Sequence, residues 1–101
     1  MQKVYTLEEI KQMLYPIFQT VSVYKAILFG SYAKGLATEN IDIDIVIDSN
    51  GELLNIYFYG LLEEIIEKLG KKVDLIEISE IEKDSPIYKE IENEGVVVYE
   101  K

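Results

Sequence analysis

Residues 29–48 read FGSYAKGLATENIDIDIVID, and this stretch decides the fold of the chain. A glycine-serine pair follows an apolar run, and isoleucine and aspartate then alternate. Alternation of period two predicts a β-strand over residues 41–48, with isoleucines on one face and Asp42, Asp44 and Asp48 on the other. Aspartate is a poor strand former, and like charges on one face repel each other. The pattern therefore indicates that something positively charged binds these carboxylates.

A pair of magnesium ions suits this arrangement. Asp42 and Asp44 lie about 6.6 Å apart along a strand, whereas two magnesium ions in a phosphoryl-transfer site lie about 3.5–4 Å apart. In 72-KVDLIEI-78, Asp74 shares a strand face with two isoleucines, where a carboxylate is unexpected unless something binds it. Placed on a neighbouring strand, Asp74 would ligate the second ion and activate an attacking hydroxyl. The candidate catalytic residues and metal ligands are therefore Asp42, Asp44 and Asp74.

The glycine-serine pair supplies a candidate phosphate site. Gly30 follows a predicted strand and allows a tight turn with close approach of the backbone to a ligand. Backbone amides and the Ser31 hydroxyl at a helix start bind anions. Gly30 and Ser31 are therefore the candidate nucleotide-binding residues, and the matching reaction is in-line attack at the α-phosphorus of a nucleotide.

The rest of the chain predicts a mixed sheet. Helical periodicity begins at about Leu7, where Thr6 and Glu9 form a capping box, and it recurs over residues 52–69. A further helix follows Ser85-Pro86, and a short helical turn covers residues 31–36. The strands are expected at residues 23–29, 41–48, 72–78 and 96–99. This order favours a single α+β domain over residues 1–101, a mixed sheet of about four strands with helices packed on one face.

Composition excludes several classes of chemistry. The 101 residues include no cysteine and no histidine, so thiolate chemistry and histidine-based catalysis are excluded. A net charge of −9 argues against a broad DNA or RNA footprint and is compatible with bound cations or a basic protein partner. No secretory leader and no membrane-spanning run is visible, so we expect a cytoplasmic protein.

At this point the sequence resembles a known family. Gly30-Ser31, ten residues, and then Asp42-Ile43-Asp44 is the signature of the polymerase-β-like nucleotidyltransferase superfamily. LFGSYAKG and IDIDIVID resemble its minimal nucleotidyltransferase (MNT) branch, the small partners of HEPN-domain proteins. There are two departures: Ile41 stands where the family often has serine, and Lys34 stands where arginine is common.

The resemblance implies a function. Gly30 and Ser31 would bind the phosphates of ATP, and Asp42, Asp44 and Asp74 would ligate Mg²⁺. Such proteins are antitoxins that transfer AMP from ATP to a tyrosine of a cognate HEPN toxin, so a HEPN protein is the expected partner, in a hetero-complex or oligomer. The alternatives are a catalytically weak antitoxin that neutralises its toxin by binding, and a subunit that modifies a small molecule with a separate substrate-binding chain.

Simpler interpretations stand beside these. Asp42 and Asp44 could lie on a solvent-exposed sheet face, and Asp74 could have only a structural role. Gly30 could only form a turn, and Ser31 could only cap a helix. Asp48 is expected to cap the turn after its strand. Glu77 falls on the opposite strand face from Asp74 and is left out of the site. The aromatic residues 57–59 are expected to serve core packing or a partner interface.

Overall fold

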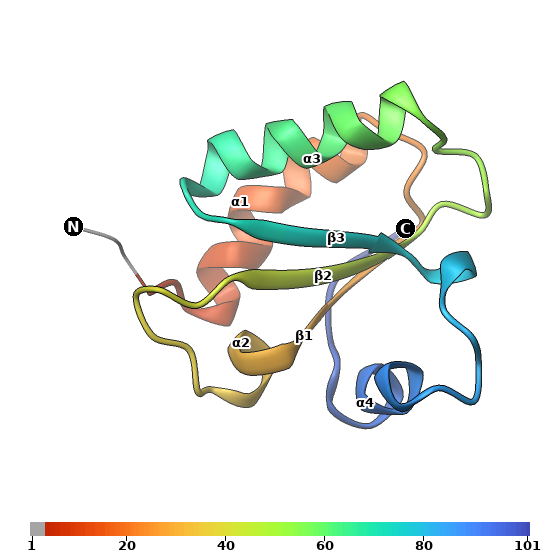
Figure 1. Ribbon diagram of the computed structural model, residues 1–101. Coiled ribbons are helices and arrows are strands. Elements are labelled where there is room, and N and C mark those ends of the chain that lie inside the picture. Colours follow the sequence, from red (N-terminus) through yellow and green to blue (C-terminus); the bar gives the residue numbers. More distant parts are fainter. Residues whose placement is uncertain (1–3) are drawn as a thin grey trace.

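The computed structural model describes residues 4–101, whose strands form one four-stranded sheet in the order β3-β2-β1-β4 (Figure 1). β1 is antiparallel to both β2 and β4, whereas β2 and β3 are parallel, so the predicted mixed sheet is confirmed. The strands are β1 (Lys25–Phe29), β2 (Ile43–Asp48), β3 (Val73–Glu77) and β4 (Val96–Glu100). The helices are α1 (Leu7–Gln19), α2 (Gly30–Lys34), α3 (Ile56–Leu69), the 3₁₀ turn η1 (Ile78–Glu80) and α4 (Pro86–Glu94).

The element boundaries follow local signals. α1 begins with the predicted capping box. The Thr6 hydroxyl accepts a hydrogen bond from the backbone N–H of Glu9, and the Glu9 carboxylate accepts one from the backbone N–H of Thr6. The helix continues through Pro16 to Gln19. α3 begins four residues later than its apolar spacing predicts, because Asn50, Gly51 and Asn55 adopt positive φ and hold residues 49–55 in turns.

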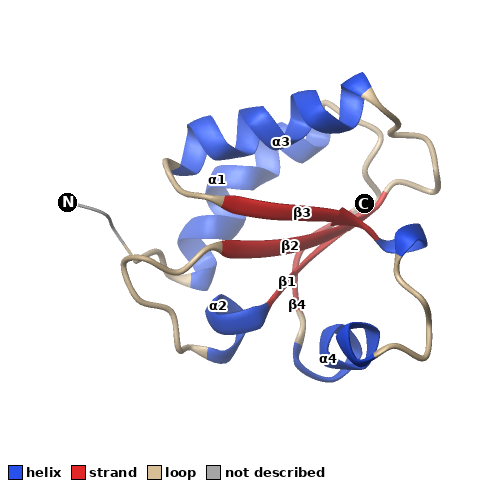
Figure 2. Ribbon diagram, viewed as in Figure 1, coloured by secondary structure: helices blue, strands red, loops and turns tan. Residues whose placement is uncertain are grey.

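The isoleucine face of β2 is the centre of the core. Ile43, Ile45 and Ile47 are fully buried in one cluster with the apolar sides of α1 and α3. Figure 2 shows these two helices together on one side of the sheet. Each fully buried isoleucine stabilises the fold by about 1.5–3 kcal/mol, so this strand is held firmly in register.

The other face of the sheet also carries a helix, which corrects the expectation that all helices pack on one face. Ile91 of α4 packs against Phe29 and Val46 in a second, smaller apolar cluster. Val46 interrupts the series of aspartates on this face of β2 and supplies the apolar contact that α4 needs. α4 therefore covers part of the aspartate face of β2, over Val46.

None of the helices in residues 4–101 is long and apolar enough to cross a membrane.

Candidate active site

The parallel pairing of β2 with β3 places two of the predicted carboxylates side by side. Asp44 and Asp74 are directly paired residues in the ladder. Neighbouring strands lie about 4.8 Å apart, and paired residues point to the same face. Asp44 is half-buried and Asp74 is exposed, so the pair has one protected and one accessible carboxylate.

Gly30 lies directly against this pair. Phe29 is the residue of β1 paired with Asp44, and Gly30 follows it at φ 72°. A Cβ atom added to Gly30 would lie 2.3 Å from Oδ2 of Asp44. Glycine is therefore required here both by the left-handed backbone and by the close approach of the turn to the carboxylate.

A pocket of about 530 Å³ joins these three residues. Gly30, Asp44 and Asp74 form its sheet side, and Pro86, Ile87 and Glu90 of α4 contribute to its opposite wall. A volume of this size is in the range of small-molecule sites. The pocket therefore combines the turn at Gly30, two carboxylates and an apolar wall.

Burial and neighbouring carboxylates both disfavour a negative charge on Asp44 in this pocket. The pKa of Asp44 is raised to about 6, first by burial, then by its hydrogen bond with Asp74 and the charge of Asp74, and further by the charges of Asp42 and Glu90. Three neighbouring acidic groups thus destabilise the ionised form of Asp44. A cation bound between Asp44 and Asp74 would remove this cost.

The donor set fits magnesium through two carboxylates. Mg²⁺ is commonly bound by one or two carboxylates together with phosphate oxygens and water, and Asp44 and Asp74 offer hard oxygen atoms on adjacent strands. Within residues 4–101, no group of three acidic side chains lies close enough together to hold a metal ion. The structure thus supports a two-carboxylate site that substrate phosphates would complete.

Asp42 and Ser31 lie next to this pocket and do not line it. Asp42 stands immediately before β2 and lines a neighbouring pocket with Lys71 and Lys72, although its charge still acts on Asp44. Lys71 is buried and donates a hydrogen bond of 2.8 Å to the backbone oxygen of Glu39, which ties down the loop that leads to Asp42. Ser31 is half-buried in the first turn of α2.

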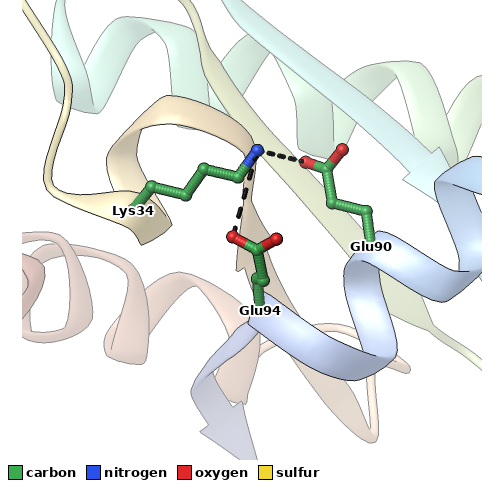
Figure 3. A network of polar contacts seen from close by, with 3 residues as sticks. All are labelled: Lys34, Glu90 and Glu94. Carbon is green, nitrogen blue, oxygen red and sulfur yellow. Dashed lines mark ion pairs between the residues drawn. The ribbon is translucent and has the colours of Figure 1, made fainter.

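Lys34 has partners in α4. Its ammonium nitrogen lies 3.7 Å from a carboxylate oxygen of Glu90 and 4.0 Å from one of Glu94 (Figure 3). All three side chains are partly exposed, so each ion pair contributes at most about 1 kcal/mol. The pairs nevertheless connect α2, which begins at Gly30, to α4.

Glu90 is a residue of the pocket that sequence reasoning missed. It lines the pocket beside Asp44 and Asp74 and also pairs with Lys34. The helical pattern after Pro86 could predict α4 but not that α4 crosses the aspartate face. Its only available signal was the apolar spacing from Ile87 to Ile91, which requires some surface to pack on.

Two further carboxylates have structural roles. The carboxylate of Asp48 accepts a hydrogen bond of 2.9 Å from the backbone N–H of Asn50, which confirms the predicted turn cap. Glu77 is buried and accepts hydrogen bonds from the backbone and hydroxyl of Ser49 and from the backbone of Ser79. Glu77 thus joins β3 to the turn after β2.

Comparison with known proteins shows the family. The chain matches the model of the nucleotidyltransferase domain over residues 6–98. It is 36% identical over 93 residues to MJ0435 of Methanocaldococcus jannaschii, for which protein adenylyltransferase activity has been proposed, and the match covers 91% of this chain and 97% of that protein. It is also 36% identical over 98 residues to protein adenylyltransferase MntA of Thermococcus cleftensis, covering 92% of this chain and 96% of that protein.

Solved structures share the fold. A chain of a toxin–antitoxin solved with AMP-PNP superposes with a TM-score of 0.73 at 23% identity, covering 96% of this chain and 75% of the other. A chain of the complex between tri-AMPylated Shewanella oneidensis HEPN toxin and MNT antitoxin gives a TM-score of 0.66 at 19% identity, covering 95% of this chain and 74% of the other. With its glycine turn against paired aspartates, and with a family match over nearly its whole length, the chain belongs to the nucleotidyltransferase domain family.

Proposed function

We propose that this chain is an antitoxin that transfers AMP from ATP to a tyrosine hydroxyl of a HEPN-domain toxin, in a reaction that requires Mg²⁺. The observation that carries the proposal is the pairing of Asp44 with Asp74 beside Gly30 in a single pocket. The relatives named as protein adenylyltransferases support AMP transfer to protein, since the chain matches 96–97% of their length. The HEPN toxin bound in the neighbouring solved structure supports the class of partner.

The proposed reaction forms one phosphorus–oxygen bond and breaks another. The tyrosine oxygen attacks the α-phosphorus of ATP, pyrophosphate leaves, and the hydroxyl proton passes to a carboxylate. Asp74 suits the role of proton acceptor because it is exposed at the pocket and lies next to the protected Asp44. Gly30 and Ser31 would hold the phosphates through backbone amides and the serine hydroxyl.

Bound Mg²⁺ would polarise the phosphoryl oxygens and offset the negative charge of the pocket. Asp44 and Asp74 would hold it, and Asp42 would act on the pocket through its charge, or as a third ligand once phosphates are present. In either role of Asp42, the proposed catalysis requires the pair formed by Asp44 and Asp74.

Transfer of label from ATP tests the proposal. The chain is co-expressed with a HEPN-domain protein of its own organism, and the complex is incubated with Mg²⁺ and ATP labelled at the α-phosphate. We expect label on a tyrosine of the HEPN protein with the native chain and none with Asp42→Asn/Asp44→Asn. The matched control is Asp84→Asn, since Asp84 is an exposed loop residue that takes no part in the pocket.

The second candidate is an antitoxin that acts by binding. The observation that favours it is that no three acidic side chains converge on one point within the described part of the chain. It predicts a stable complex in which neither form of the chain labels the HEPN protein and the double variant still neutralises the toxin. Label on a small molecule in place of protein would instead indicate a different acceptor.

A further inference from the structure

A groove of about 420 Å³ runs along the outer edge of β3. β3 is an edge strand, so its outer backbone groups have no strand partner among residues 4–101. The opposite side of the groove comes from the turn before α3 and from its first residues, where Leu54, Phe58 and Tyr59 line it. Figure 1 shows α3 running alongside β3 at this border of the sheet.

The groove is continuous with the candidate active site. Asp74, Leu75 and Ile76 line both the groove and the pocket that contains Asp44. A chain that lies along β3 would therefore pass directly beside the carboxylate pair. From these observations we propose that the groove binds an extended segment of the protein acceptor, which adds to the sheet as a strand next to β3. The inference rests on the proposed function and specifies where the acceptor binds.

Side chains alternate between the two faces of a strand, and this alternation explains how an acceptor strand next to β3 would direct a tyrosine toward the pocket. Side chains of neighbouring strands at paired positions lie on the same face. An acceptor tyrosine paired near Asp74 would point to the face where Asp44 and the pocket lie. The residues before and after that tyrosine would point to the other face, toward α3.

The surface of the groove specifies the chemistry of the segment. Leu54 and Tyr59 are 58% and 65% exposed, so they offer apolar area that the chain itself leaves unburied. The exposed charged side chains that line the groove are Asp74 and Glu80, and no basic residue lines it. The chain as a whole has a net charge of −9. A segment with apolar residues beside the tyrosine and with basic residues nearby fits this surface.

A matched pair of tyrosines tests the groove. Tyr59 of α3 and Tyr15 of α1 are both exposed, and each makes an edge-to-face ring contact, with Phe58 at 5.6 Å and with Tyr99 at 5.5 Å. Tyr15 lies on a different helix, outside the groove. The comparison is Tyr59→Ser, alone and with Leu54→Ser, against Tyr15→Ser.

The assay is AMP transfer to the HEPN-domain protein, added separately at increasing concentration. We expect the double variant to raise the KM for this protein by about tenfold or more, because buried apolar anchors dominate binding. The KM for ATP should stay within about twofold, and Tyr15→Ser should change neither value. An unchanged KM for the HEPN protein in the double variant, with transfer by the native chain intact, would overturn the groove and leave the proposed function standing.

Hydrogen exchange gives a readout that does not depend on catalysis. β4 is the other edge strand of the sheet and serves as the internal control. Adding the HEPN protein should slow exchange in residues 72–80 and leave residues 96–101 unchanged. Slowed exchange in β4 alone, or in neither strand, would refute docking on β3 even if transfer proves to be absent. Docking would also be refuted if β3 of the native chain is protected by pairing with a second copy of the chain and the double variant loses this pairing.

Discussion

Replacement of Asp44 by asparagine should stabilise the metal-free protein at neutral pH while abolishing its activity. The pKa of Asp44 is raised from 3.8 to about 6 by burial, by Asp74 and by the charges of Asp42 and Glu90. Because the folded-state pKa lies above the unfolded value, the folded chain binds the proton more tightly, and stability falls as pH rises from about 4 to about 6. Asparagine cannot ionise and can still donate a hydrogen bond to Asp74.

The size of the effect follows from the shift. A rise from 3.8 to about 6 corresponds to about 3 kcal/mol, at about 1.36 kcal/mol for each pKa unit. Asp44 is only half-buried, so screening by solvent reduces this to about 1 kcal/mol. Urea unfolding of the native chain and of Asp44→Asn is therefore compared at about pH 4.5 and about pH 7.5. The variant should gain about 1 kcal/mol at the higher pH and much less at the lower one.

Magnesium should reverse the order of stability. At a tenfold excess of Mg²⁺ over its Kd, the native chain should gain about 1.4 kcal/mol, and Asp44→Asn should gain little. Asp84→Asn controls for the loss of one negative charge on an exposed loop. If Asp44→Asn is destabilised by the same amount at both pH values, burial and the acidic neighbours do not disfavour the ionised form of Asp44 in the folded protein, and the reasoning is refuted.

Three further substitutions test the surrounding structure. Gly30→Ala should destabilise the fold and abolish AMP transfer, because its Cβ would lie 2.3 Å from Oδ2 of Asp44 at φ 72°; urea unfolding and the labelling assay measure both effects. Gly60→Ala should stabilise the protein by about 0.5–1 kcal/mol, since the added Cβ meets no neighbouring atom in α3, and an unchanged or lowered melting temperature would contradict this. Glu77→Leu should cost about 2–3 kcal/mol in urea unfolding, because it leaves the buried Ser49 backbone and hydroxyl without their acceptor; a loss below about 0.5 kcal/mol would show that water replaces it.

The sequence alone determined the strand pattern and indicated the family. The isoleucines of residues 41–47 predicted the buried face of β2 because a strand places every second side chain on one side. The match between the glycine-serine turn, its ten-residue gap and the aspartate strand indicated the family that the comparison confirms. These features are local in the chain, so period and spacing are enough to recognise them.

Tertiary structure decided what surrounds those residues. The pairing of Asp44 with Asp74 depends on the register of two strands separated by α3, and no local pattern specifies that register. The position of Glu90 depends on the packing of α4 against Phe29 and Val46, across the aspartate face. The raised pKa of Asp44 follows from both, because burial and neighbouring charges are properties of the folded arrangement. Residue type thus determined which groups could do the chemistry, whereas long-range packing determined which of them meet.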